Sequence, residues 1–297
     1  MCRNGTINIK NIEKTVNRKL EEKTMKRFIK LAAVGILVAT TVLGAAGCSN
    51  KSADSKEVKI GVVGSDTDVW DYVAKKVEKD DGIKIKIVKF SDYNQPNKAL
   101  SNGDLDLNSF QHRIFLDNYN KETKDNLTPI GDTVIAPLGI YSEKVKNPQD
   151  LKNGAKIVIP NDVTNEGRSL KLLERAGLIK LKPNAGIFAT PKDIVENSRN
   201  LEITPVDASQ TARSIKDSDA VIINSGVAVD AGIIPTKDSI LLEPVNKDSK
   251  PYVNIIVARA KDKDNEVFKK IVKAYQSDDV KEVIKETSKG SSIPAWE

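Results

Sequence analysis

Short strand-like runs alternate with helical segments from residue 58 to the end of the chain, and this alternation limits the possible folds more than any other feature. Residues 58–64 (VKIGVVG), 83–90 and 133–142 have the composition of strands, whereas 68–79 carries apolar side chains at helical spacing. Strands that alternate with helices are typical of α/β proteins, whose helices cover a mostly parallel sheet. We therefore expect an α/β fold after residue 58.

The same alternation restarts near residue 148, which indicates a second α/β unit. Strands are expected at 156–160, 201–206 and 220–224, and the chain closes with extended runs at 239–245 and 252–260 and one helix at 265–287. If the closing segments pack on the first unit, two lobes result, with 58–143 and 250–297 in the first and 144–249 in the second. Ligands bind at the carboxyl ends of strands in open α/β sheets, so we expect a cleft between the lobes.

Residues 25–47 have the pattern of a secretory signal peptide. Met25 opens a short basic stretch, residues 31–43 are apolar apart from Thr40 and Thr41, and small residues at 45–47 precede Cys48. A cysteine at this place is typical of lipoproteins, so we expect acylation of Cys48, palmitate included, and a flexible tether at 48–57. The alternative is a transmembrane helix, but the apolar run is shorter than the roughly 18 residues that such a helix needs.

Residues 1–24 precede this complete signal peptide, although such signals lie at true N-termini. We therefore expect Met25 to be the real start and 1–24 to be leader sequence upstream of it. The string EEK at 21–23 would have purine-rich codons, as a bacterial ribosome-binding site requires. The alternative is a genuine N-terminal extension.

The basic charge of the chain belongs to these N-terminal residues. Of 47 Lys and Arg and 41 Asp and Glu, residues 1–47 hold nine and three, so 38 of each remain. A neutral remainder lacks the basic footprint of a nucleic-acid-binding protein. The two cysteines, Cys2 and Cys48, precede the expected domain, which excludes disulfides and thiolate metal sites from it.

Catalytic motifs are missing from the sequence. It contains a single histidine, His112, and no zinc-protease, serine-hydrolase or phosphate-loop pattern. One histidine with scattered carboxylates is also a weak basis for a metal site. We therefore predict a binding protein that is not an enzyme and that holds no metal and no cofactor.

Polar and aromatic side chains gather where strands are expected to end. The segment that contains Phe110 and His112 combines rings with amides, although both residues could equally be structural. Arg168, near an expected helix start, can offer a bidentate fork to a carboxylate or form a surface salt bridge. Asn224 and Asn254 end or interrupt apolar runs, so each either fixes a loop or contacts a polar ligand.

Six strings, which together span nearly all of 58–297, carry a family resemblance. They are FSDYNQPNKALSNGDLDLNSFQH, APLGIYS, VIPNDVTNEGRSLKLLERAGLIKLK, AVIIN, SKPYVNIIVAR and AYQSDDVKEVI. In this order they resemble the methionine-binding lipoproteins of bacterial ABC uptake transporters, the NlpA-type lipoprotein family. The resemblance implies an α/β, two-lobed, periplasmic-binding-protein-like (type II) fold with mixed, mostly parallel sheets and two inter-lobe crossings.

The resemblance also implies roles for single residues. Arg168 is similar to the arginine that binds the α-carboxylate of the ligand, and Asn224 and Asn254 resemble the asparagines that hold its polar end. Apolar and aromatic groups pack well on a thioether because its sulfur is polarizable. The family's wall around that thioether resembles Tyr93, Phe110, His112 and Tyr141.

The implied function is the capture of L-methionine between the lobes and its delivery to a permease with a cytoplasmic ATPase. The protein would act as a monomer, held by lipid on Cys48 at the outer face of the cell membrane, and its content of Lys, Asn and Ile favours a Gram-positive bacterium. Val227 stands where the family often has a tyrosine, so we expect a roomier pocket. The alternatives are a methionine-containing dipeptide, another amino acid, or a surface adhesin or receptor with this fold.

Overall fold

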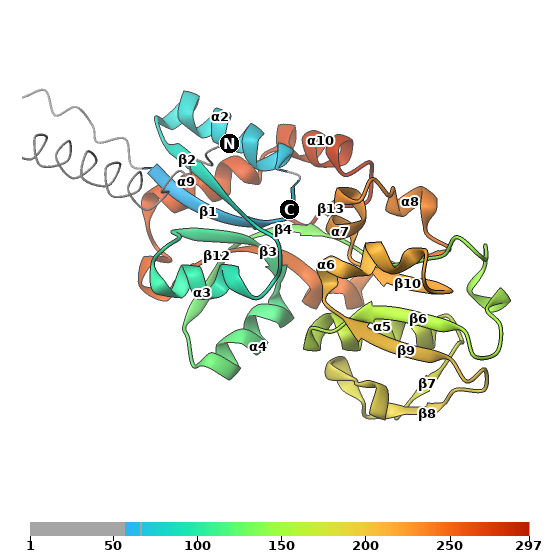
Figure 1. Ribbon diagram of the computed structural model, residues 1–297. Helices are drawn as coiled ribbons and strands as arrows, with labels where there is room; N and C mark the ends of the chain where they lie inside the picture. Colours follow the sequence, from blue (N-terminus) through green and yellow to red (C-terminus); the bar gives the residue numbers. More distant parts are fainter. Residues whose placement is uncertain (1–56, 66, 297) are drawn as a thin grey trace, which may run out of the picture. The chain divides into compact units, whose positions relative to one another are not determined.

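The computed structural model describes residues 57–65 and 67–296, which form two lobes built on two β-sheets (Figure 1). The expected leader, the signal peptide, Cys48 and nearly all of the tether lie outside the described residues. The first sheet has six strands in the order β13-β4-β12-β3-β1-β2. Their bounds are β1 Glu57–Val63, β2 Lys84–Phe90, β3 Leu107–His112, β4 Leu127–Ile135, β12 Val253–Arg259 and β13 Ile293–Pro294.

The second sheet has five strands in the order β11-β5-β10-β6-β9, and β7 pairs with β8 in a separate ribbon. Their bounds are β5 Gly139–Tyr141, β6 Lys156–Pro160, β7 Lys180–Leu181, β8 Ile194–Glu196, β9 Glu202–Val206, β10 Ala220–Ile223 and β11 Leu241–Leu242.

Helices connect most of these strands. The α-helices are α2 Asp68–Asp81, α3 Gln95–Asn102, α4 Arg113–Thr123, α5 Val163–Arg175, α6 Ala208–Thr211, α7 Ser225–Asp230, α8 Pro235–Asp238, α9 Glu266–Tyr275 and α10 Asp278–Thr287. The 3-10 turns are η1 Pro148–Asp150, η2 Gly186–Phe188, η3 Pro191–Asp193, η4 Ala212–Ile215, η5 Lys247–Tyr252 and η6 Ala260–Asp262. In the part of the chain that the structure describes, none of the helices has the length and apolar character to cross a membrane.

Both sheets are mixed, and the expected α/β fold class is confirmed. β1 runs parallel to its neighbours β2 and β3, and β6 runs parallel to β9 and β10. The other pairs in the two sheets are antiparallel, a larger share than the strand–helix alternation predicts. The reason is the connection between the lobes. β5 and β12 each begin directly after a crossing, so they start at the edge where the parallel strands end.

The first crossing lies at residues 136–138, between β4 and β5. The sequence predicted one strand at 133–142 and a first lobe that extends to residue 143. The structure instead divides this run between the two lobes. β4 belongs to the first sheet, whereas β5 pairs with β10 in the second. Pro137 separates the two strands, and a proline has no N–H to donate to a ladder. The second crossing spans 243–252, close to the boundary expected at 249.

The long helix expected at 265–287 is divided into α9 and α10. α9 ends at Tyr275, and Gln276 Nε2 then donates to the carbonyl oxygen of Asp132 in β4 at 2.9 Å. Ser277 has an extended backbone, with φ −95° and ψ 160°, before α10 begins. The break lets the two helices turn separate apolar faces to the same core, which contains Phe268 from α9 and Ile284 from α10.

Helices cover both faces of each sheet, and neighbouring strand residues face opposite cores (Figure 1). In β12, Ile256 packs in the core with α2, α9 and α10, whereas Ile255 packs with α3 and α4. In β10, Ile222 faces the core with α5, whereas Val221 faces α7. This alternation follows from the two-residue period of a strand. Each lobe therefore has a core of its own on both sides of its sheet.

Two helical glycines test how closely the second lobe is packed. At Gly167 in α5 a Cβ would lie 2.3 Å from the carbonyl oxygen of Ile187 in η2, whereas at Gly226 in α7 it would meet no atom outside its own segment within 4 Å. We expect Gly167→Ala to lower the free energy of unfolding by about 1–3 kcal/mol, because backbone has to shift. Gly226→Ala should leave it unchanged or raise it by up to about 1 kcal/mol. Equal urea midpoints for the two variants would contradict this packing.

Candidate functional site

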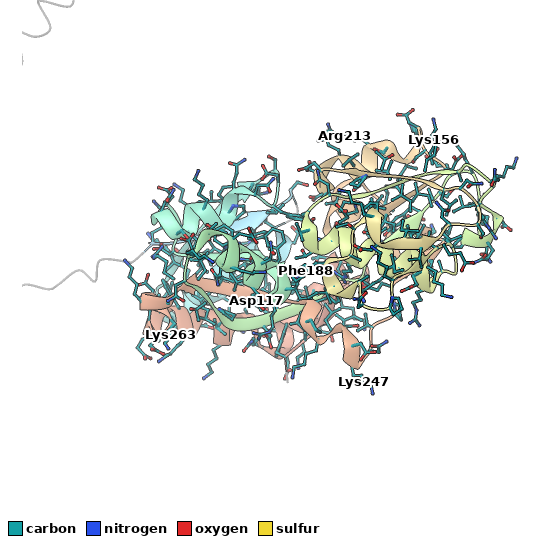
Figure 2. All side chains as sticks on the ribbon, turned by 90° about the horizontal axis from the view of Figure 1, so that it is seen from below. Asp117, Lys156, Phe188, Arg213, Lys247 and Lys263 are labelled. Atoms are coloured by element: carbon teal, nitrogen blue, oxygen red, sulfur yellow. The ribbon has the colours of Figure 1, made fainter. Side chains whose placement is uncertain are left out.

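Two adjoining chambers lie where the strand ends of the two lobes meet. The inner chamber has a volume of about 210 Å³ and the outer chamber about 410 Å³. Both are lined by Val63, Tyr93, Phe115 and Val227. The first three belong to the first lobe and Val227 to the second, so the cavity lies between the lobes. Figure 2 shows the side chains from below and labels one residue of α4, Asp117, and one of η2, Phe188.

The structure brings six of the seven ligand-binding residues predicted from the sequence to the inner chamber. They lie at strand ends and near helix starts, because His112 closes β3, Asn224 directly follows β10 and Arg168 lies in the second turn of α5. Asn254 in β12 pairs with His112 across the sheet. The six residues are Tyr93, Phe110, His112, Arg168, Asn224 and Asn254.

Tyr141, the seventh, lines neither chamber. Its side chain is 2% exposed and packs with Val221, Ile223 and Ala228 in the second lobe. The ring lies over Gly139, where a Cβ would be 2.6 Å from ring atoms. Because β5 belongs to the second sheet, Tyr141 faces α7 instead of the ligand cleft. Its predicted place in the aromatic wall is therefore wrong.

Phe115 takes the place in the wall that was predicted for Tyr141. The ring centroids of Phe110 and Phe115 are 5.7 Å apart in an edge-to-face arrangement, and those of Tyr93 and Phe110 are 6.0 Å apart and stacked. Tyr93 also meets Phe115 edge-to-face at 6.2 Å. Such pairs are favourable beyond the area that they bury. The three rings form a continuous apolar wall on the first lobe.

His112 is a buried and neutral hydrogen-bond donor. Its Nδ1 accepts from the backbone N–H of Phe115 at 3.1 Å and so caps α4. Nε2 must then carry the proton, and it has no hydrogen-bond partner among the described residues. Burial, and after it the positive charge of Arg168, lowers the pKa of His112 from 6.5 to about 3. The side chain of Asn165 raises the pKa in part, but its geometry relative to His112 Nε2 does not meet that of a hydrogen bond.

Arg168 pairs with a carboxylate of its own protein. The residue is 4% exposed, its Nε donates to Glu243 Oε1 at 2.9 Å, and its Nη2 donates to Glu243 Oε2. A buried guanidinium needs such a counter-charge. The contact is neither the open fork for a ligand nor the surface salt bridge predicted from the sequence. The hydrogen bonds of Arg168 to Glu243 and Ala136 use Nε and Nη2, which leaves Nη1 as the donor for a ligand.

The same ion pair holds both crossings between the lobes. In the first crossing, the carbonyl oxygen of Ala136 accepts from Arg168 Nη2 at 3.1 Å, and the N–H of Leu138 donates to Glu243 Oε2 at 3.1 Å. Glu243 itself lies in the second crossing. The guanidinium also stacks on the ring of Tyr252 at the end of η5, 4.3 Å from its centroid. A residue that lines the cavity is thus tied to both segments about which the lobes can move.

Two amide oxygens complete the polar surface of the inner chamber. Oδ1 of Asn165 and Oδ1 of Asn224 are buried and accept no hydrogen bond from the described residues. The Nδ2 of Asn165 lies 3.0 Å from each carboxylate oxygen of Asp162, which fixes the orientation of the amide. Buried polar atoms normally have partners. With His112 Nε2 and Arg168 Nη1 as donors, these acceptors form a surface that matches a zwitterion.

The outer chamber is acidic and partly aromatic. Its lining includes four carboxylates and no lysine, arginine or histidine. Two of the carboxylates cap helices, because Asp162 accepts from the N–H of Asn165 at 3.0 Å and Asp207 accepts from the N–H of Ser209 at 2.9 Å. Within residues 57–65 and 67–296, no group of three or more metal-ligating side chains is placed to hold a metal ion.

Two residues that the sequence reasoning missed had a usable signal. Phe115 follows His112 by three positions, and Asn165 precedes Arg168 by three, so each shares a helix face or start with a predicted residue. Glu243 had no such signal, because only the path of the second crossing brings it to Arg168.

A family model described as NlpA lipoprotein matches residues 58–296, which include both lobes. The chain belongs to the NlpA lipoprotein family. This membership confirms the resemblance carried by the six strings.

Curated relatives and solved structures are similar to the chain over most of their length. The D-methionine-binding lipoprotein MetQ of Salmonella typhimurium is 43% identical over 236 residues, 78% of this chain and 85% of the relative. A solved nutrient binding protein from Burkholderia cenocepacia bound to methionine is 46% identical with a TM-score of 0.78, and covers 80% of this chain and 100% of its own. The substrate binding protein of a methionine transporter from Streptococcus pneumoniae is 42% identical with a TM-score of 0.77, over 81% and 96%. These likenesses confirm the expected two-lobed fold.

Glu243→Ala tests the ion pair at the crossings. Loss of the Glu243 carboxylate leaves the Arg168 charge buried and unpaired. We therefore expect the free energy of unfolding to fall by about 3 kcal/mol. This is the lower end of the range for buried pairs, because the Glu243 side chain keeps 18% exposure. In the control Asp278→Ala, which removes a 96% exposed partner of Lys281, the change should stay below about 0.5 kcal/mol. Equal losses in urea denaturation would contradict the role of Glu243.

His112 predicts a pH dependence of stability. The pKa of His112 in the folded chain, about 3, is below the ordinary 6.5, so the unfolded chain binds this proton first as the pH falls. The contribution of His112 to the free energy of unfolding is therefore fully present above pH 6.5. It is lost as the pH falls from 6.5 towards 3. Between pH 8 and pH 5, wild type should lose about 2 kcal/mol more unfolding free energy than His112→Asn. Asparagine is the matched replacement, since it can still cap Phe115. Parallel curves for the two proteins would refute the neutral, buried imidazole.

Proposed function

We propose that this chain is the substrate-binding lipoprotein of an ABC importer and that its cleft captures L-methionine. The observation that carries the proposal is the polarity of the inner chamber, where the donors His112 Nε2 and Arg168 Nη1 and two amide acceptors stand beside an aromatic wall. Membership of the NlpA lipoprotein family supports it, and so do relatives whose names refer to methionine.

The polar end of an α-amino acid matches the unpaired atoms. Its carboxylate would accept hydrogen bonds from His112 Nε2 and Arg168 Nη1, and its ammonium group would donate to Asn224 Oδ1 and Asn165 Oδ1. Asn254 lies beside His112 in the sheet and would contact the same end of the ligand. The positive charge of Arg168 is already balanced by Glu243, so the zwitterion enters without a change in the net charge of the chamber.

The side chain of methionine fits the aromatic wall. A thioether sulfur makes favourable contacts at ring edges about 5 Å away, and Phe110, Phe115 and Tyr93 offer such edges. The inner chamber, about 210 Å³, is smaller than the roughly 300–1,000 Å³ of sites for drug-sized ligands. This size favours one amino acid.

A methionine-containing dipeptide is the second candidate. Val227 lines both chambers, and its small side chain stands where a tyrosine was expected from the family pattern. The outer chamber adds about 410 Å³ next to the inner one. A ligand longer than one amino acid would therefore extend from the inner chamber into the outer one.

Transport follows from closure of the lobes on the ligand, because only the closed state contacts it from both sides. The loaded protein would deliver methionine to a permease whose cytoplasmic ATPase supplies the energy. No bond is made or broken, so the chain acts as a binding protein and not as an enzyme. A lipid on Cys48 would hold the monomer on the outer face of the cell membrane. A Gram-positive origin stays a prediction from composition.

Titration calorimetry of the full chain with L-methionine tests the function. Wild type should bind it, and Asn224→Ala should weaken binding at least about tenfold, because the ammonium group loses a buried acceptor. Asn153→Ala, an exposed asparagine of the second lobe, should bind like wild type. If the wild-type chain gives no binding heat with L-methionine, the proposal is refuted.

Mass spectrometry of ligand released on denaturation separates the two candidates. Freshly purified chain that carries methionine supports the single amino acid. Release of a methionine-containing dipeptide would overturn that assignment and favour a ligand that reaches the outer chamber.

A further inference from the structure

The loop after β1 contacts the end of α7 at the rim of the inner chamber. Asp230, the last residue of α7, accepts a hydrogen bond from the Ser65 hydroxyl at 2.6 Å. The backbone N–H of Ser65 lies 3.1 Å from each carboxylate oxygen of Asp230. These bonds join residues 165 positions apart, one in each lobe. We call this group of Gly64, Ser65 and Asp230 the rim latch.

The loop is shaped to receive a carboxylate. Gly64 has φ +101°, a conformation that other residues rarely adopt, and a Cβ there would lie 2.3 Å from Asp230 Oδ2. The loop is also anchored to the end of β2 in the first lobe. The N–H of Gly64 donates to the carbonyl oxygen of Phe90 at 3.0 Å, and Lys89 Nζ donates to the carbonyl oxygen of Ser65 at 2.8 Å. The first lobe thus presents a fixed pair of donors, with no side chain between them and Asp230.

α7 connects the rim latch with the ligand site. Asn224 precedes the helix, and Asn224, Val227 and Asp230 all line the inner chamber. Ser225 Oγ donates to the carbonyl oxygen of Pro137 in the first crossing at 2.6 Å. Residues 224–230 therefore carry a ligand acceptor at one end, a bond to the crossing, and the latch carboxylate at the other end.

We propose that Asp230 is a positioning residue that holds the cleft shut over its ligand through the rim latch. The inference rests on the proposed capture of an amino acid. A contact made only in the closed state stabilises that state and slows release of the ligand, whereas the encounter with the open state is unchanged. Ligand bound at Asn224 brings α7 to the place where Asp230 reaches Ser65. Capture and locking are thereby coupled through one short helix.

The dissociation rate of labelled L-methionine from the full chain tests the latch. Asp230→Ala should release the ligand about tenfold faster, because the charged acceptor of the Ser65 bonds is lost. The association rate should stay within about twofold of wild type. The matched control is Asp217→Ala, which removes an equal charge from an exposed position of the second lobe and should release methionine like wild type.

A double-mutant cycle separates the latch from a direct contact between Asp230 and the ligand. Ser65 does not line the inner chamber, so Ser65→Ala can act only through the latch. We expect Ser65→Ala to speed release several-fold in wild type and to have no further effect in Asp230→Ala. Equal effects of Ser65→Ala in both backgrounds, or none in wild type, would overturn the proposal. Gly64→Ala provides an independent route, since its Cβ excludes Asp230, and should also speed release.

Hydrogen exchange keeps the latch distinguishable from the proposed function. The amide of Ser65 should exchange faster in Asp230→Ala than in wild type, and at the wild-type rate in Asp217→Ala. If wild type does not bind methionine, the proposed function fails. The exchange rate of the Ser65 amide then tests the latch without any ligand. If wild type binds methionine but Asp230→Ala shows unchanged release and exchange, the latch fails and the function stands.

Discussion

The cleft depends on a buried ion pair between Arg168 and Glu243. Arg168 belongs to α5 of the second lobe, Glu243 belongs to the second crossing, and their bonds to Ala136 and Leu138 include the first crossing. A charge that is 4% exposed cannot lose its partner without a large penalty. α5 is therefore held against both crossings, and Nη1 is the guanidinium nitrogen that these bonds leave unused. This contact fixes the place of Arg168 in the chamber wall and leaves Nη1 as its remaining donor.

Contacts that cap helices orient the other polar atoms of the site. His112 caps α4 with one ring nitrogen, which leaves the other nitrogen as a donor in the chamber. Asn165 is fixed by Asp162, the residue that caps α5, and its amide oxygen is left unpaired. Groups held in this way lose little freedom when a ligand arrives, so less binding free energy is spent on ordering them. The rim latch at Asp230 would add a contact that exists only after closure.

The sequence predicted most strands because a buried strand depends on local composition. β1, β6 and β10 lie within one residue of the expected ranges, since each is a short β-branched run. The differences occur where a break depends on a distant partner. The run at 133–142 reads as one strand, but its two ends pair with different sheets. The run at 265–287 reads as one helix, but Gln276 leaves it to bond with Asp132 in β4.

By itself the sequence determined the family, the α/β class and the residue types of the site. His112, Asn224 and Arg168 could be selected because strand ends and helix starts are readable from composition, and such ends converge in α/β sheets. Only the tertiary structure decided which partner each residue takes. Arg168 meets Glu243, 75 positions away, and Tyr141 turns to α7 with the second sheet. The physical reason is that the surroundings of a buried charge or ring are set by segments far apart in the chain, and local composition carries no record of them.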